Sequence, residues 1–441
     1  MKYKQKIILA LLCLVSAGQA LAQLEIEIVK SEVDALPIAV VPFAWNASQP
    51  PPAVAVDEVI SADLYRSGLF APLARRDMIE QPTAPVDVRF GTWRLLNTDA
   101  LVIGQIDDDG DSAYRASFWL FDVNTGEQLL ALQESIGVDN LRFGAHRIAD
   151  RIYEALTGTP GAFATRIAFV IQTQLADRQS YELVVADADG YNQTSLVTDG
   201  QPLMSPAWSP DGRQLAYVSF ARGNSTIILQ DVYTGANRII ASFKGINGAP
   251  AFSPDGRHLA LTLSRTGNPE VFVYDLQSGE FTQLTRHWAI DTEPVWTPDG
   301  RDILFTSDRG GKPQIYSIPA AGGEVERITF RGENNAAADI SPDGQLLATA
   351  FAIDNVYKIA IHDRKNEQLR VLSDGILDES PSFAPNGSML LYAAKEQGQG
   401  VLYAVSADGN VRQKLVTSAG DVREPVWSPF EQQRSGVEQQ Q

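Results

Sequence analysis

The stretch Pro206–Ser219, PAWSPDGRQLAYVS, decides the fold of this chain, because close copies of it recur along the rest of the sequence. The copies are PAFSPDGRHLALTLS from Pro250, PVWTPDGRDILFTSD from Pro294, ADISPDGQLLATAF from Ala338, PSFAPNGSMLLYAA from Pro381 and the fragment PVWSPF from Pro425. The proline after Ser, Thr or Ala falls at positions 210, 254, 298, 342, 385 and 429, at intervals of 44, 44, 44, 43 and 44. A fixed period of this length is typical of repeat architectures.

Each copy is predicted to form four short strands separated by turns. In the first copy the strands are expected at residues 207–209, 215–220, 226–231 and 238–243. β-Branched and aromatic residues dominate these runs, and the Pro210-Asp211-Gly212 turn combines a proline that presets φ with a glycine that accepts a positive φ. Four strands every ~40–45 residues is the period of a propeller blade. Stacked helix pairs would need a period of about 3.6 residues, which these segments lack.

The two ends of the repeat array indicate how the ring closes. The first repeat begins at Arg166 and lacks the strand before its turn, whereas the last fragment, 424–430, is that strand alone. Together they complete one blade, so five complete units and one composite unit predict a six-bladed β-propeller over residues 161–430. An open solenoid with frayed ends is the alternative, but it would leave unpaired sheet edges that the composite blade removes.

The length and charge of the chain restrict its class. The chain has 441 residues, more than a single core of ~250–300 residues accommodates, so at least two structural units are expected. Asp and Glu number 54 against 36 Lys and Arg, which gives a net charge of −18. An acidic chain is a poor ligand for nucleic acid and for anionic lipid, and it favours a partner with a basic face.

Residues 1–22 are predicted to be a signal peptide. Lysines precede the apolar run 7–15, and Ala20-Leu21-Ala22 supplies a small-x-small cleavage pattern, so the mature chain is expected to begin at Gln23. A membrane anchor is the alternative, but this apolar run is too short to cross a bilayer. Cys13 is the only cysteine of the chain, so the exported form would contain neither a disulfide nor a reactive thiol.

Residues 23–160 lack the repeat and are predicted to form a small α/β domain ahead of the propeller. Its strands are expected at residues 24–29, 37–43, 100–106, 113–122 and 128–136, from alternating or continuous apolar patterns. Helices are predicted at 54–68 and 141–156, where apolar residues share one face and a glycine marks the end. Residues 157–161 are the expected hinge to the propeller, and residues 431–441 the expected disordered tail.

The sequence carries no recognised catalytic or metal-binding signature. Its four histidines stand far apart with no cysteine beside them, so we expect neither a metal site nor a cofactor. The Gly-x-Ser-x-Gly elbow of peptidases and esterases that carry propellers is absent from the sequence. An enzyme that works through acidic residues of the propeller tunnel is the remaining alternative, although no His, Lys or Tyr recurs beside those acids.

The loops that lead into the innermost strand of each blade are the expected binding site. They would crowd one face of the tunnel, and acidic residues recur in them: Asp291, Glu293, Asp378, Glu379, Asp421 and Glu424. Such a rim suits a basic or amide-rich partner surface, or a cation. A rim that is merely solvated is the alternative interpretation.

The combined pattern resembles the TolB family over nearly the whole mature chain. The resemblance rests on LPIAVVPF, ISADLYRSGLF, DALVIGQI, TGTPGAFATRIAFV, SYELVVADADGYNQ, QPLMSPAWSPDG, NGAPAFSPDG and REPVWSPF, in this order. It implies a non-enzymatic periplasmic protein of the Tol-Pal system that links the lipoprotein Pal to the inner-membrane protein TolA. This link serves outer-membrane integrity and constriction during cell division. A scaffold for other envelope partners is the alternative. We expect a monomer that neither inserts into the membrane nor binds nucleic acid.

The resemblance also implies where the partners bind. Pal is expected on the tunnel face, at the matching positions Ala249, Thr292 and Glu293, with these neighbours as further candidates: Asn247, Asp291, Asp378, Glu379 and Glu424. The family often carries His where this sequence has Ile246. TolA is expected to bind the N-terminal segment 23–34, through Gln23, Leu24, Glu25, Ile26, Glu27, Ile28, Val29 and Lys30. Some bacteriocins exploit the same propeller face in the family and are further candidate partners.

Overall fold

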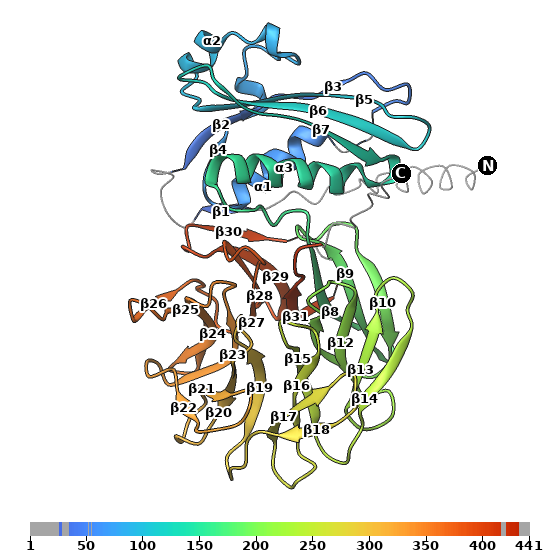
Figure 1. Cartoon of the computed structure of the whole chain (residues 1–441), viewed down its shortest axis with the longest axis vertical. Coiled ribbons are helices and arrows are strands. Elements are labelled where there is room, and N and C mark those ends of the chain that lie inside the picture. The colour runs from blue at the N-terminus through green and yellow to red at the C-terminus, as the bar shows by residue number, and fades with distance from the viewer. Residues whose placement is uncertain (1–25, 29–34, 52, 54, 416–419, 432–441) are drawn as a thin grey trace, which may run out of the picture.

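A small α/β domain and a six-bladed β-propeller make up the part of the chain that the structure describes (Figure 1). The structure is a computed structural model, and it describes residues 26–28, 35–51, 53, 55–415 and 420–431. The six-bladed propeller and the small α/β region before it confirm the fold class predicted from the repeat. None of the helices in the described ranges is long and apolar enough to cross a lipid bilayer.

The 44-residue repeat forms one blade of four antiparallel strands in each period. The first blade consists of β11 (Leu203–Trp208), β12 (Gln214–Ser219), β13 (Thr226–Asp231) and β14 (Asn237–Ala241). The second consists of β15 (Asn247–Phe252), β16 (His258–Leu263), β17 (Glu270–Asp275) and β18 (Phe281–Gln283). The third consists of β19 (Asp291–Trp296), β20 (Asp302–Ser307), β21 (Gln314–Pro319) and β22 (Glu326–Arg327). The second strand of each of these blades is buried along nearly its whole length, because apolar side chains of neighbouring blades pack against both of its faces.

The remaining blades include the composite one. The fourth blade is β23 (Asn334–Ile340), β24 (Leu346–Ile353), β25 (Val356–Asp363) and β26 (Gln368–Val371). The fifth is β27 (Asp378–Phe383), β28 (Met389–Glu396), β29 (Gln399–Ser406) and β30 (Val411–Lys414). The sixth joins β8 (Arg166–Gln174), β9 (Gln179–Asp187) and β10 (Thr194–Asp199) to the C-terminal strand β31 (Asp421–Trp427).

The composite blade closes the ring through strands from opposite ends of the array. β31 pairs antiparallel with β8, so that Trp427 lies opposite Ile167. The indole N–H of Trp427 donates a hydrogen bond of 2.7 Å to the hydroxyl of Thr165, and Ser428 N donates to the carbonyl of Arg166. The complementary ends of the repeat predict this pairing, which leaves no inner strand without a neighbour.

The N-terminal domain is a mixed sheet covered by two long helices. Its strands are β2 (Leu36–Val40), β3 (Ala44–Trp45), β4 (Phe70–Pro72), β5 (Ala100–Asp108), β6 (Ala113–Asp122) and β7 (Gln128–Gly137). Its helices are α1 (Val56–Arg66), α2 (Phe90–Leu95) and α3 (Leu141–Thr157). The sheet order is β4-β2-β5-β6-β7, and β3 also pairs with β5. The pairs β2–β4, β2–β5 and β3–β5 are parallel, whereas β5–β6 and β6–β7 are antiparallel.

The helices α1 and α3 lie between the sheet and the propeller (Figure 1). Helix α3 buries Leu141, Ala145, Ile148 and Ile152 on one face and ends at Gly158, whose φ of 74° allows the left-handed end of the helix. The predictions of both helices and of the hairpin that β5 and β6 form are confirmed. One hydrophobic cluster runs without a break from the N-terminal sheet through both helices into β8 and β28, so the two domains share a core.

Candidate partner-docking site at the tunnel mouth

The innermost strands of the six blades line a central tunnel of about 870 Å³. Each of them carries one β-bulge near its start, where the register against the second strand of the blade shifts by one residue. The residue with positive φ at each bulge is Ser205, Ala249, Glu293, Ala337, Ser380 or Glu424. All six of these bulge residues line the tunnel. A bulge re-aims a side chain relative to the normal alternation of a strand, and here it does so at equivalent positions around the ring.

The structure corrects the expected setting of the acidic residues. They were expected in loops, whereas the structure places them within the first residues of inner strands: Asp291, Glu293, Asp378, Glu379 and Glu424. Hydrogen bonding to the second strand of each blade continues to the tunnel mouth, because the bulge absorbs the extra residue without ending the strand. The rim is therefore built from strands, with less freedom to adapt than loops would have.

Two of the predicted binding residues are fully buried and engaged within the fold. The carboxylate of Asp291 accepts hydrogen bonds from Ser307 Oγ at 2.6 Å and from Arg309 Nη2 at 2.7 Å. The amide of Asn247 accepts from the N–H of Phe243 at 2.9 Å and donates to nearby carbonyls. These side chains tie the incoming chain to the blade and are not part of the partner-facing surface.

Asp378, at the equivalent position of the fifth blade, is also buried, with 1% of its surface exposed. Neither carboxylate oxygen has a hydrogen-bond partner of standard geometry among the described residues. Burial raises the pKa of Asp378, and the nearby Ser373 and Gly375 only partly offset this effect. The expectation that Asp291 and Asp378 form an exposed acidic rim is therefore wrong, because the inner strand starts below the surface.

The half-buried acids of the tunnel tie neighbouring blades together. Glu293 accepts hydrogen bonds of 2.8 Å from Thr306 Oγ1 in its own blade and of 2.8 Å from the backbone N–H of Ala337 in the next blade. Glu424 accepts the corresponding hydrogen bond from the N–H of Ser205. Glu293 is thus a fold determinant as well as a candidate contact, which corrects the simpler view of it as a contact alone.

The remaining predicted residues of this face are partly accessible. Ala249, Thr292 and Glu379 are half-buried, and Ala249 and Glu379 line the tunnel. Burial raises the pKa of Glu424, and the charges of Glu379 and Glu293 raise it further, which places these three acids in one electrostatic environment. The tunnel is acidic near its mouth.

Exposed apolar side chains flank this mouth, and the sequence pattern pointed only to Ile246 among them. Ile246, Ile290 and Leu377 each stand directly before the first residue of an inner strand, at the same position of the repeat, and 40–49% of each is exposed. Met204, Trp288, Phe330 and Ile376 are exposed in the same segments. Ile246, Ile290 and Leu377 occupy the same position of the repeat, so the repeat pattern in the sequence could have identified them. Their exposure to solvent, however, is visible only in the folded structure. We call these seven residues the apolar rim.

The predicted N-terminal binding segment is described only in its centre. Strand β1 (Ile26–Ile28) pairs antiparallel with β30 as a fifth strand of the fifth blade, with Glu27 opposite Arg412. The other predicted positions, Gln23, Leu24, Glu25, Val29 and Lys30, lie outside the described residues. The segment therefore has the capacity to add to the edge of a sheet, and it does so within this molecule.

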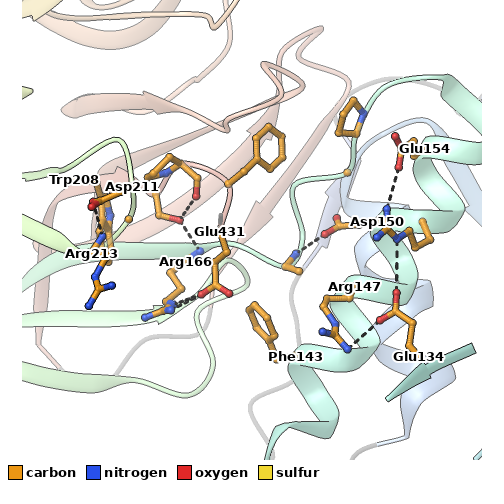
Figure 2. Close-up of a pocket in the computed structure, with 18 of the residues that line it drawn as sticks. Glu134, Phe143, Arg147, Asp150, Glu154, Arg166, Trp208, Asp211, Arg213 and Glu431 are labelled. Atoms are coloured by element: carbon orange, nitrogen blue, oxygen red, sulfur yellow. Dashed lines mark hydrogen bonds and ion pairs between the residues drawn. The ribbon is translucent and has the colours of Figure 1, made fainter. Parts of the chain in front are cut away.

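A second large cavity, of about 1500 Å³, lies between the N-terminal domain and the propeller. Figure 2 shows that its charged side chains approach one another in pairs. Glu134 forms two ion pairs: its Oε2 lies 3.0 Å from Arg147 Nη2, and its Oε1 lies 3.6 Å from Arg151 Nε. Arg166 forms an ion pair with Glu431. These five charged side chains of the cleft are therefore already paired within the protein.

Comparisons with known proteins agree with this architecture. The model of the TolB amino-terminal domain matches residues 24–129, and that of the TolB beta propeller domain matches residues 153–431. Tol-Pal system protein TolB of Xanthomonas oryzae pv. oryzae (strain PXO99A) is 55% identical over 435 residues, which cover 98% of this chain and 99% of the relative. The corresponding protein of Xanthomonas campestris pv. campestris (strain B100) is 56% identical over 423 residues, 96% of each chain.

A solved structure gives the same result in three dimensions. The crystal structure of TolB from Acinetobacter baumannii superposes with a TM-score of 0.85 at 38% sequence identity, and the match covers 92% of this chain and all of that one. The match thus extends over both domains, and the sequence relatives span nearly their full lengths. The chain therefore belongs to the TolB family.

Proposed function

We propose that this protein is a non-enzymatic interaction module of the periplasm that links Pal to TolA within the Tol-Pal system. In this role it supports outer-membrane integrity and constriction during cell division. The observation that carries the proposal is the apolar rim around the mouth of an acidic tunnel, in a chain whose relatives are named Tol-Pal system protein TolB.

The tunnel mouth has the chemistry of a protein-docking surface. Large exposed apolar side chains such as Trp288, Phe330 and Ile376 supply the surface that a partner can remove from water. The half-buried Glu293, which lines the tunnel, supplies an acceptor for a basic or amide-rich group. Pal is the proposed occupant of this face, with Ala249, Thr292, Glu293 and Glu379 beside the apolar rim as its contacts, and bacteriocins are proposed as competitors for it.

The segment 23–34 is the proposed TolA-binding element. Its central residues, Ile26–Ile28, already form an edge strand on β30 through backbone pairing. Strand addition of this kind depends on backbone hydrogen bonds, which a sheet edge of another protein can also provide. We propose that the same residues pair with TolA.

The alternative of an enzyme has less support from the described site. The tunnel acids Glu293 and Glu424 use their oxygens to accept hydrogen bonds from the backbone of the next blade, which holds them in place and reduces their freedom to transfer protons. A scaffold for other envelope proteins would use the same surfaces with other partners. A pull-down from envelope extract distinguishes it, because Pal and TolA would then be missing from the captured proteins.

The deciding experiment compares two matched isoleucine substitutions. Ile290 lies in the apolar rim with 48% of its surface exposed, and Ile239 lies on the outer strand β14 with 41% exposed. Ile290→Asp should weaken binding of soluble Pal at least tenfold, since a charge would replace buried apolar surface in the complex. Ile239→Asp should change the dissociation constant less than about twofold.

Two results would contradict the proposal. If Ile290→Asp bound Pal as tightly as the unchanged protein, Pal would not use the apolar rim. If neither Pal nor TolA bound the unchanged protein, the bridging function itself would be wrong. The proposed location is tested separately by intact mass: the protein released from the periplasm should begin at Gln23, and retention of residues 1–22 in a membrane fraction would contradict it.

A further inference from the structure

A buried group of charged side chains connects the two domains. It consists of Asp63 on α1, His146 on α3 and Asp189 in the turn after β9 of the propeller. His146 has no exposed surface. Its Nδ1 lies 2.6 Å from Asp63 Oδ2, within hydrogen-bond distance, and its Nε2 lies 3.6 Å from Asp189 Oδ2. One imidazole ring thus stands between a carboxylate of the N-terminal domain and a carboxylate of the propeller.

Two arginines complete the group and decide what it can bind. Arg66 donates to Asp63 Oδ1 at 2.8 Å, and Arg142 pairs with Asp189. The guanidinium of Arg142 lies over the ring of Tyr191, with its Cζ 3.9 Å from the ring centroid. The three ligand-type side chains are close enough together to share a metal ion, but these guanidinium groups already occupy the carboxylates and would repel a cation. The ion that the site accommodates without rearrangement is a proton on His146.

We propose that Asp63, His146 and Asp189 form a proton-sensitive joint, which holds the N-terminal domain and the propeller in one orientation when His146 is protonated and loosens when it is neutral. An imidazolium donates from both ring nitrogens and attracts both carboxylates, whereas a neutral ring has only one N–H. Loss of the proton therefore removes the contribution of His146 to the attraction across the domain boundary, while the Arg142–Asp189 pair and the burial of the acids remain. This property is independent of any partner.

The charges that face His146 favour its protonated form. Asp63 and Arg66 approach from α1, Arg142 and Asp150 from α3, and Asp187 and Asp189 from the propeller. Burial alone lowers the pKa of His146, but Asp63 and then Asp189 outweigh it, so the pKa lies above the ordinary value of 6.5. Since the folded pKa is raised, the joint should be complete below about pH 6.5 and weaken as pH rises through the folded pKa.

Asp150 extends the joint to the segment that connects the domains. Its carboxylate accepts hydrogen bonds from the N–H groups of Phe163 at 2.7 Å and Ala164 at 3.0 Å, and Figure 2 shows it turned toward this connection. Burial raises the pKa of Asp150 to about 7. Above this pH a further negative charge develops beside Asp63. The N–H groups of Phe163 and Ala164 and the positive charge of His146 favour the ionised carboxylate of Asp150. Deprotonation of Asp150 therefore strengthens its bonds to the connection, in contrast to deprotonation of His146.

The experiment measures domain orientation against pH. The chain from Gln23 onward contains no cysteine, so Val86→Cys on the N-terminal domain and Arg301→Cys on the propeller allow a spin-label pair at two exposed positions. The interlabel distance distribution should broaden or shift as pH rises through the titration of His146. His146→Gln should remove this change. His258→Gln alters a partly exposed histidine that pairs with Asp275 within the propeller, and this matched control should retain the change.

Titration of the imidazole signals by NMR keeps the test decisive if His146→Gln fails to fold. The midpoint of the distance change should then coincide with the titration of His146 in the otherwise unchanged protein. A distance distribution that stays constant while His146 titrates would overturn the proposal. So would a change that persists in folded His146→Gln, or one whose midpoint differs from that of His146.

Discussion

The carboxylate of Glu293 accepts a hydrogen bond of 2.8 Å from the backbone N–H of Ala337, the residue one repeat of 44 positions later in the chain. Glu424 forms the equivalent contact with Ser205, and Asp339 accepts from the N–H of Phe383 at 2.6 Å. Each bond crosses from one innermost strand to the next. The acids of the tunnel therefore hold neighbouring blades together, which sets conditions on how their role in binding can be tested.

Glu293 should be tested with two substitutions that separate stability from binding. Glu293→Gln keeps an oxygen acceptor for Thr306 and Ala337, so its free energy of unfolding should fall by less than about 0.5 kcal/mol. Glu293→Ala removes the acceptor and should cost about 1–3 kcal/mol. If the charge contacts Pal, Glu293→Gln should still weaken Pal binding about tenfold or more. Urea unfolding and Pal binding kinetics measure both quantities; unchanged Pal affinity in folded Glu293→Gln would exclude the contact.

Trp427 should be essential for closing the ring. It is 5% exposed, and its indole is hydrogen bonded to Thr165, which directly precedes β8 of the composite blade. Trp427→Ala should reduce the free energy of unfolding by about 3–5 kcal/mol, because it creates a cavity and breaks this bond. Trp288 is 76% exposed, so Trp288→Ala serves as the matched control and should cost less than about 0.5 kcal/mol. Equal unfolding free energies of the two variants would contradict the assigned role of β31.

Asp339 should make stability depend on pH in a predictable direction. Burial raises its pKa from the ordinary 3.8 to about 6, so the folded protein binds a proton that the unfolded chain releases between these values. The unfolding free energy should therefore fall as pH rises from about 4 to 6, by at most about 3 kcal/mol from this group. Asp339→Asn cannot titrate and should show a flatter profile. Parallel profiles of the two proteins in urea unfolding would show that this carboxyl does not contribute.

Removal of residues 23–34 should abolish TolA binding and leave the propeller intact. In the structure, three of these residues add to the outer edge of the fifth blade, while ring closure depends on β31 and β8 elsewhere. The melting temperature should change by less than about 2 °C, which corresponds to a loss of at most about 2 kcal/mol for a protein of this size. Calorimetry measures the melting temperature, and a binding assay measures the affinity for TolA. Retained TolA binding would exclude the segment, and a large loss of melting temperature would show that it is part of the core.

Much of the fold was predictable because the signals are local. Pro210-Asp211-Gly212 predicts its turn, and the strand predicted at residues 226–231 agrees with β13 in both bounds. The helix predicted at 141–156 matches α3 to within one residue, since its apolar face and Gly158 lie within a few turns of each other. The candidate site was less predictable. Spacing alone placed Asp291 at the tunnel mouth, but it could not show that Arg309 and Ser307 bury this acid.

The sequence by itself determined the number of blades and their closure, because the 44-residue period and its two complementary ends are properties of order along the chain. Only the tertiary structure decided what each acid does. The bulges turn Glu293 toward Ala337, and the domain boundary brings Asp63 and Asp189 to opposite sides of His146. The pKa and accessibility of a carboxylate depend on burial and on charges contributed by distant segments. These partners stand 43 to 126 positions apart in the chain, so no local pattern encodes them and packing alone brings them together.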